Sequence, residues 1–325
     1  MVDEFGPHPV GGVDYPRTLQ KFDDWFSSEA ACRTYLQRLR WRESFRCPKC
    51  AGNEAWKTNT GHLKCKQCRH RTSATAGTIF EGTQKPLRVW FQAMWYVTSR
   101  KSGGSALGLQ QLLGLGSYQT AWSWLHKLRR AMVRPSRDRL RGCVEVDETY
   151  VGGDEEGVHG RQTEDKAIVV VAAEEEGRGI GRIRLRRVPD VSGDSLEAFI
   201  EESVTPGSVV HTDGWKGYGN IAKKSYTHQV TILSQSDEPA HKLMPRVHLV
   251  ASHLKRWLLG THQGAVSQQH LDYYLDEFTF RFNRRRSRAR GMLFYRLLDN
   301  AVRVDPVPYK QLVGGTSASG ADHYM

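Results

Sequence analysis

VEVDETYVGG, at residues 144–153, decides the fold of this chain, because valines alternate ahead of Asp147 as they do in a buried strand. A second stretch, VVHTDGWKGY at residues 209–218, repeats the arrangement, with two valines leading to Asp213. A buried sheet delivers the side chains at its strand ends into a crevice. We therefore expect both aspartates to reach one ligand-binding crevice at the edge of a sheet.

A third stretch, VHLVASHLKRWLLG at residues 247–260, is predicted to form a helix. His248 lies 35 residues after Asp213, and Lys255 follows it by seven residues, which is two helical turns. On a helix both side chains project from one face, which could supply a metal ligand together with a phosphate-binding cation. His253 is the competing candidate for the ligand, but it lies two residues before Lys255 and points to a different face.

Together these residues predict a two-metal site for phosphoryl transfer. Cleaving a phosphodiester needs a nucleophile, and it needs charge to be stabilised on the attacking and leaving oxygens, which two metal ions about 4 Å apart supply. We expect Asp147 to bridge the ions, Asp213 to bind one, and His248 to bind the other through a neutral imidazole nitrogen. Lys255 would hold a phosphate as a point charge. Glu145 shares a strand face with Asp147 and would support the ligands from behind.

Cysteine spacing predicts a second, structural metal site. Four of the six cysteines form two CxxC pairs with fourteen residues between them: Cys47, Cys50, Cys65 and Cys68. Two-residue gaps let both thiolates of a pair reach one tetrahedral ion, which is typical of a zinc ribbon. Four thiolates leave no open position for water, so we expect this one zinc ion to do no chemistry. A disulfide or redox pair is the alternative, but no secretion signal accompanies the motif.

The segment between the ribbon and the first acid is predicted to be helical. From Pro86 to Met132 apolar residues recur with helical spacing, interrupted by turns at Gly103-Gly104 and Gly114. A helix, a glycine-containing turn and a second helix resemble a helix-turn-helix. Its recognition residues would be Tyr118, Gln119, Thr120 and Ser123, with phosphate contacts from Lys127, Arg129 and Arg130. A plain helical linker with an aromatic core is the alternative.

Composition favours a polyanionic partner. The chain has 325 residues, of which 47 are basic and 35 are acidic, and its net charge is +12. An arginine block continues an apolar-faced helix near residues 281–290, and we interpret it as a further phosphate contact. The first residues lack the pattern of a signal peptide, and the longest apolar run, at residues 167–173, is too short to span a bilayer. We therefore expect a soluble, cytoplasmic protein.

The motif DETYVGG, the two CxxC pairs and the seven-residue step to Lys255 resemble DDE-type transposases of bacterial insertion sequences, in the group with an N-terminal zinc ribbon. The resemblance covers residues from about Leu19 to about Leu298. Most of these enzymes have Glu at the third ligand position, whereas this sequence has His248. Some subgroups are similar in using Asn or His there, so we interpret the site as a variant triad.

The resemblance implies a function and its partners. Such an enzyme cuts DNA strands at transposon ends and joins the 3′-hydroxyls to target DNA. It implies double-stranded DNA as the partner, both as terminal inverted repeats and as target, with Mg²⁺ or Mn²⁺ as the two catalytic ions. It also implies a homo-oligomer on DNA, associated with the nucleoid. The alternative is a catalytically inactive, transposase-derived regulator that keeps only the zinc ribbon and the helix-turn-helix.

Pattern and resemblance together predict a multi-domain chain whose catalytic part has the α/β RNase H-like fold. Its predicted order is three antiparallel strands, a helix, a strand, a helix, a strand and a helix. The predicted map of the chain is a flexible tail at 1–18, a helical lead-in at 19–45, the zinc ribbon at 46–80, the helix-turn-helix-like region at 86–135, the RNase H-like domain at 142–300 and a tail at 301–325.

Overall fold

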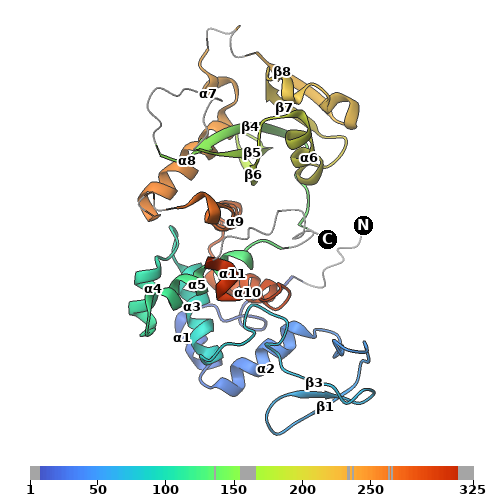
Figure 1. Cartoon of the computed structure of the whole chain (residues 1–325), viewed down its shortest axis with the longest axis vertical. Coiled ribbons are helices and arrows are strands. Elements are labelled where there is room, and N and C mark those ends of the chain that lie inside the picture. Colours follow the sequence, from blue (N-terminus) through green and yellow to red (C-terminus); the bar gives the residue numbers. More distant parts are fainter. Residues whose placement is uncertain are drawn as a thin grey trace. The chain divides into compact units, whose positions relative to one another are not determined.

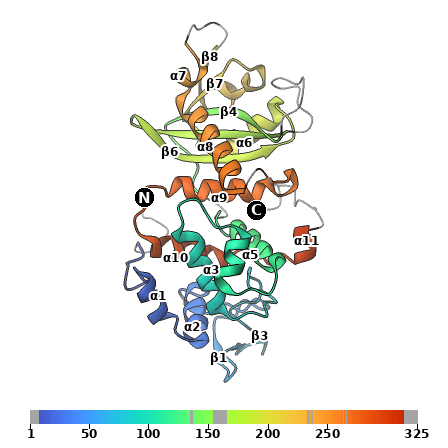
Figure 2. The ribbon, with the colours of Figure 1, turned by 90° about the vertical axis from the view of Figure 1, so that its left-hand side faces the viewer.

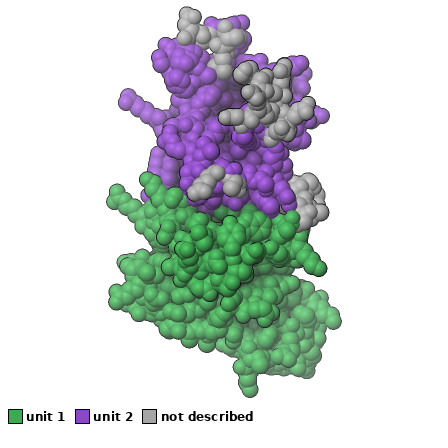
Figure 3. Space-filling model, turned by 60° about the vertical axis from the view of Figure 1, so that its left-hand side comes forward, with its two compact units in different colours: residues 1–134, 287–316 green, residues 135–286, 317–325 purple. Residues whose placement is uncertain are grey.

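The computed structural model describes residues 8–134, 137–153, 166–232, 235, 238–262, 264 and 266–313. The chain folds into two compact units (Figure 3). The first unit contains the described residues up to Arg134 together with residues 287–313, and the second contains the described residues from 137 to 286. Parts of the predicted terminal tails and the polar loop at residues 154–165 lie outside the described residues.

The first unit is helical and carries the ribbon. Two helices, α1 (Leu19–Trp25) and α2 (Glu29–Arg40), precede a small sheet of β1 (Ala55–Lys57), β2 (Leu63–Cys65) and β3 (Arg71–Thr72). Three more helices follow: α3 (Leu87–Ser99), α4 (Ala106–Leu113) and α5 (Tyr118–Arg130). The hydroxyls of Ser105 and Ser117 accept backbone N–H bonds at the starts of α4 and α5, which is how serine caps a helix. The three predicted helices therefore form at the predicted places.

Aromatic packing brings the C-terminal helices into this first unit. Helix α10 (Arg290–Ala301) packs on α3, and the short α11 (Tyr309–Val313) lies against α5 (Figure 2). Phe294 on α10 meets Phe22, Phe26 and Phe91 in edge-on and tilted contacts, and all four rings are fully buried. The predicted catalytic domain extended to residue 300, but the unit boundary falls after Arg286, because the apolar face of α10 is buried here.

The second unit is a five-stranded mixed sheet with the order β6-β5-β4-β7-β8. Strands β4 (Cys143–Val151), β5 (Ala167–Glu176) and β6 (Gly179–Val188) are antiparallel, whereas β7 (Val209–Asp213) and β8 (Thr227–Thr231) run parallel to β4. Three antiparallel strands followed by a helix and then by parallel strands on the other side of β4 form the RNase H-like arrangement. The fold class predicted from the sequence is confirmed.

Helices cover both faces of this sheet (Figure 1). Helix α6 (Gly193–Ser203) lies on one face, and α7 (Ala240–Leu243), α8 (Pro245–His262) and α9 (Leu271–Asn283) belong to the other side. Short 3₁₀ turns occur at Lys216–Tyr218, Ile221–Lys224 and Gln268–His270. Side chains alternate along β4, so Val144 and Val146 enter the core beneath α6, and Glu145 and Asp147 face α8. The sheet therefore presents its acids to the helix that carries the third candidate ligand.

The arginine block at the end of α9 has partners within its own unit. Asn283 pairs with the edge strand β6, accepting from Ile183 N at 2.7 Å and donating to Ile183 O at 3.1 Å. Arg281 forms an ion pair with the buried Glu277 at 2.6 Å, and Arg285 donates to backbone carbonyls of β6. Arg286 pairs with Glu176 at 2.5 Å. These arginines have partners within their own unit, but Arg285 and Arg286 remain exposed, so the expected phosphate contact stays a prediction.

Candidate catalytic and zinc sites

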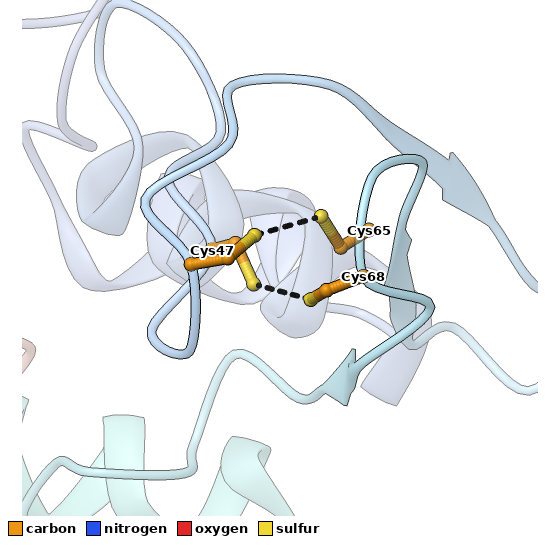
Figure 4. A group of neighbouring side chains, drawn as sticks. Cys47, Cys65 and Cys68 are labelled. Atoms are coloured by element: carbon orange, nitrogen blue, oxygen red, sulfur yellow. Dashed lines mark hydrogen bonds between the residues drawn. The ribbon is translucent and has the colours of Figure 1, made fainter.

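The four ribbon cysteines form a compact cluster. All four sulfur atoms lie within 4.8 Å of one another, and the side chains of Cys47, Cys65 and Cys68 point together in Figure 4. Cys47 Sγ lies 3.5 Å from Cys68 Sγ, and Cys50 Sγ lies 3.6 Å from Cys65 Sγ. Tetrahedral zinc with bonds of about 2.3 Å sets its sulfur ligands about 3.8 Å apart. The cysteines are not joined by disulfides, and their spacing fits one zinc ion.

The same backbone conformation follows each of the two cysteine pairs of the ribbon. Ala51 and Arg69 each follow the second cysteine of a pair, and both adopt left-handed φ angles, 59° and 63°. Residues other than glycine rarely adopt this conformation. Burial raises the pKa of Cys47, but hydrogen bonds from the backbone N–H groups of Lys49 and Cys50 outweigh it and lower that pKa to about 7. A metal-bound cysteine is a thiolate, so the lowered pKa of Cys47 favours the form that binds zinc. In the metal-free cluster the backbone N–H of Gly52 is outweighed by the neighbouring thiols, which raise the pKa of Cys50.

The two aspartates lie at the same end of the sheet. Strands β4 and β7 are parallel neighbours with Glu145 opposite His211, so Asp147 and Asp213 each stand two residues beyond that pair. Asp213 Oδ1 accepts the backbone N–H of Trp215 at 3.0 Å, which fixes its carboxylate in a tight turn. The register therefore sets the two acids at matching positions on neighbouring strands, at the same end of the sheet.

His248 is the third side chain at this end of the sheet. It lies in the first turn of α8, and its Nδ1 is 4.0 Å from Asp147 Oδ2. Two ligand bonds of about 2.1 Å span at most about 4.2 Å across a shared ion, so this distance fits a common metal. The other ring nitrogen, His248 Nε2, is buried and has no hydrogen-bond partner, so the distance to Asp147 rather than this atom supports Nδ1 as the ligand. Burial lowers the pKa of His248, against the opposing charge of Glu145, so the ring is neutral near pH 7.

The remaining candidates on α8 are placed differently. The buried stripe of this helix consists of Val247, Val250, Leu254 and Leu258. Lys255 is exposed and, two turns after His248, lies on nearly the same side of the helix. His253 is half-buried and is rotated from His248 by roughly 140° about the helix axis. His248 lies beside Asp147, so the structure supports keeping it, rather than His253, as the candidate ligand.

The sequence analysis missed two neighbours of the acids. Tyr218 is fully buried, and its hydroxyl donates to Glu148 Oε2 at 3.0 Å. Burial raises the pKa of Tyr218 well above its usual value, and the charges of Glu148, Asp147 and Asp213 raise it further. The signal available was a tyrosine five residues after Asp213 in VVHTDGWKGY, but nothing local connects it with Glu148.

Arg246 is the second missed neighbour. Its guanidinium forms an ion pair with Glu145 at 2.7 Å, and its own backbone N–H also donates to that carboxylate. The expected supporting role of Glu145 therefore has a concrete partner on α8. No sequence pattern links these residues, which are 101 positions apart.

The predicted recognition surface on α5 is only partly exposed. Tyr118 and Gln119 are exposed, and Thr120 is half-buried. Ser123 is 8% exposed, with its hydroxyl donating to Thr120 O, and Arg129 is 2% exposed. These two residues were wrongly assigned to DNA contact, because the helix turns them inward. Trp90 and Trp124 stack at 3.7 Å as part of the core.

Comparison with known proteins assigns the family. The family model described as the ISXO2-like transposase domain matches residues 139–283, and the transposase zinc-ribbon domain matches residues 27–71. The chain therefore contains an ISXO2-like transposase domain and, ahead of it, a transposase zinc-ribbon domain. The two matches coincide with the sheet that holds the acids and with the four-cysteine cluster, so transposase function follows from both ends of the molecule.

Two curated relatives agree with this assignment. An uncharacterized protein in the transposable element ISH50 of Halobacterium salinarum is 27% identical over 279 residues, covering 79% of this transposase and 91% of that protein. An uncharacterized transposase-like protein of Haemophilus influenzae is 28% identical over 96 residues, covering 30% of this chain and 76% of that protein.

Solved structures show only a slight likeness. A chain of the simian T-cell lymphotropic virus intasome in complex with PP2A regulatory subunit B56 gamma is 14% identical with a TM-score of 0.28, covering 56% of this chain and 66% of that one. The Mos1 strand transfer complex gives 11% identity and a TM-score of 0.27, covering 69% and 77%. Because these scores are low, the fold assignment rests on the strand order. Within the described residues, no helix is long and apolar enough to cross a membrane.

Proposed function

We propose that this transposase cleaves DNA at transposon ends and transfers the 3′ ends to target DNA with two divalent ions, Mg²⁺ or Mn²⁺, held by Asp147, Asp213 and His248. The observation that carries the proposal is the approach of His248 Nδ1 to within 4.0 Å of Asp147 Oδ2, beside the end of β7 that holds Asp213. A half-buried imidazole whose pKa is lowered by burial is neutral, which is the form that binds a metal ion.

Each residue has a distinct part in this chemistry. Divalent ions in such a site stabilise charge on the attacking and leaving oxygens. In this proposal Asp147, on the central strand, serves both ions, whereas Asp213 on β7 and His248 on α8 each bind one. An oxygen nucleophile bonds to phosphorus as the bond from phosphorus to the 3′ oxygen breaks, and the bond electrons leave on that oxygen. Exposed Lys255 is placed to hold a neighbouring phosphate.

The proposed partner is double-stranded DNA, both as terminal inverted repeats and as target, bound by a homo-oligomer. The net charge of +12 supports a polyanionic partner, and a transposase acts where the DNA is, which for this protein we place in the cytoplasm and nucleoid. Exposed Tyr118 and Gln119 at the start of α5 are the residues best placed to meet base edges. The zinc ribbon supplies a folded module beside them, without any catalytic part.

The test separates cleavage from binding. Asp147→Asn and Asp213→Asn should each reduce strand cleavage by at least about 10³-fold, because a neutral amide is a poor ligand for a hard divalent ion. Affinity for the transposon-end duplex should stay within about threefold of the wild-type value at one salt concentration. Wild-type protein that binds the ends but never cleaves them with Mg²⁺ or Mn²⁺ would identify the regulator instead.

A further inference from the structure

Glu145 is an almost fully buried carboxylate next to the proposed metal site. Its side chain is 2% exposed and faces α8 from β4, two residues before Asp147. It accepts the backbone N–H of Arg246 at 2.8 Å and that of Val247 at 3.0 Å. The first N–H groups of a helix have no partners within the helix. Glu145 therefore caps α8 from the central strand of the sheet.

The side chain of Arg246 reinforces the same junction from the helix. Its guanidinium lies 2.7 Å from Glu145 Oε1 and 2.7 Å from Glu175 Oε1. It also donates to the carbonyl of Gly179 at 3.2 Å and to that of Gly177 at 3.3 Å, in the turn between β5 and β6. A planar guanidinium held by four acceptors has one orientation. Arg246 thus ties the start of α8 to β4, to β5 and to the following turn.

These contacts join β4 to α8, which are also the elements that carry two of the proposed metal ligands. Glu145 precedes Asp147 by two residues on β4, and Arg246 precedes His248 by two residues on α8. A shift of α8 by one residue would rotate its side chains by about 100° and translate them by about 1.5 Å. Metal-ligand distances tolerate only about 0.2 Å. The position of the His248 ring therefore depends on where the first turn of α8 is held.

We propose that Glu145 and Arg246 are positioning residues, which fix α8 on the sheet so that His248 reaches the ion bound by Asp147. The inference rests on the proposed metal site and goes beyond it, because neither residue is a ligand. A purely structural ion pair would contribute to stability and leave metal affinity unchanged. A positioning pair changes metal affinity in a protein that is still folded.

The test measures Mn²⁺ affinity of the full chain by titration calorimetry, without DNA and without turnover. Glu145→Gln keeps the shape of the side chain but sets an amide N–H₂ against the N–H donors of α8, and Arg246→Lys removes the planar fork. Each variant should bind Mn²⁺ about 10–100-fold more weakly, as for other residues that orient metal ligands. Cooperative unfolding and an unchanged zinc content show that each variant is folded.

The matched control is Leu258→Ala, at the far end of the same helix, where the side chain is 5% exposed. It lowers stability by a cavity and should leave Mn²⁺ affinity within about threefold of wild type. If Glu145→Gln and Arg246→Lys lower the unfolding temperature like Leu258→Ala and also leave Mn²⁺ affinity unchanged, the inference is overturned and the proposed function stands. If wild type and Asp147→Asn bind Mn²⁺ equally, the metal site itself is wrong, and the inference falls with it.

Discussion

One imidazole sets this site apart from a site built of three carboxylates. With His248 as the third ligand the proposed site is one charge less negative than a site of three carboxylates, because burial lowers the pKa of this ring. We expect His248→Ala to reduce strand cleavage by at least about 100-fold, through loss of a ligand. His253→Ala on the same helix should change it by less than about threefold. Single-turnover cleavage of an end duplex measures both, and equal losses from the two variants would refute the assignment.

The same imidazole predicts the choice of metal. Nitrogen ligands suit transition ions better than Mg²⁺, which prefers oxygen. We therefore expect Mn²⁺ to support cleavage at least as well as Mg²⁺ in the wild-type protein. His248→Glu restores a carboxylate and should shift the ratio of the two rates toward Mg²⁺. An unchanged ratio would mean that position 248 does not contact the ion.

The buried hydrogen bond from Tyr218 to Glu148, next to the acids, offers a separate test. Tyr218→Phe removes the hydroxyl that donates to Glu148 Oε2 and leaves the ring in the core. Loss of a buried hydrogen bond to a carboxylate should lower the free energy of unfolding by about 1–3 kcal/mol. Chemical denaturation measures this change. Tyr226→Phe, whose hydroxyl donates to the carbonyl of Val204, is the matched control for a neutral acceptor and should cost less.

Residues close in sequence were predictable, and residues joined only by the fold were not. Asp147 and His248 follow from local motifs, because a strand end and a helical spacing can be recognised in a short window. Glu148 and Tyr218 are 70 positions apart, and Glu145 and Arg246 are 101 apart, so no window contains either pair. Which neighbours a ligand has depends on strand order and helix docking, and these are set by the whole sheet.

At the scale of elements, boundaries were predicted better than packing partners. The turns predicted at Gly103-Gly104 and Gly114 separate helices α3, α4 and α5 as observed. Apolar periodicity showed that α10 and the end of α9 have buried faces, but not what covers them. Helix α10 packs on α3, and Arg285 after α9 donates to the carbonyls of Gly181 and Ile180 on β6 while its side chain stays exposed. An amphipathic pattern indicates that one face of a helix is buried, but it does not identify the element that covers that face.

One histidine on β7 and one on β8 predict that the stability of the protein depends on pH. Burial lowers the pKa of His211 below 6.5, and burial together with the charge of His211 lowers that of His228. The unfolded chain then binds more protons than the folded chain just below 6.5, so stability falls as the pH falls. The stability contributed by the two neutral histidines is fully present above pH 6.5, and it is lost as the pH falls through the lower pKa values of the folded protein.

Hydrogen exchange of the β5 and β7 amides, followed from about pH 7.5 to about pH 5, measures this stability after correction for the intrinsic rate. His228→Gln retains a polar partner for Thr212 but does not titrate, so its stability should fall less steeply with acid. Identical pH profiles for the variant and the wild type would show that the acid loss arises elsewhere.

At the scale of the whole molecule, the ribbon and the five-stranded sheet depend on different sources of stability. The sheet of the second unit is covered on both faces by apolar clusters, whereas the ribbon sheet has strands of only two or three residues around four cysteines. So small a sheet buries too little apolar surface to hold itself together, and structural zinc typically contributes about 10–16 kcal/mol to such modules. Removing the metal should therefore unfold one part of the chain and leave the other.

We expect chelation of zinc from the full-length protein to abolish hydrogen-exchange protection at residues 47–72, where the strained turns at Ala51 and Arg69 lose the ion that holds them. Protection in β4, β5 and β7 should stay within about threefold, because their cores contain no ribbon residue. Cys68→Ser should reproduce the loss without chelator, since it removes one of the four ligands. Simultaneous loss of protection in the five-stranded sheet would show that the zinc stabilises the catalytic unit as well, and that the two units fold as one.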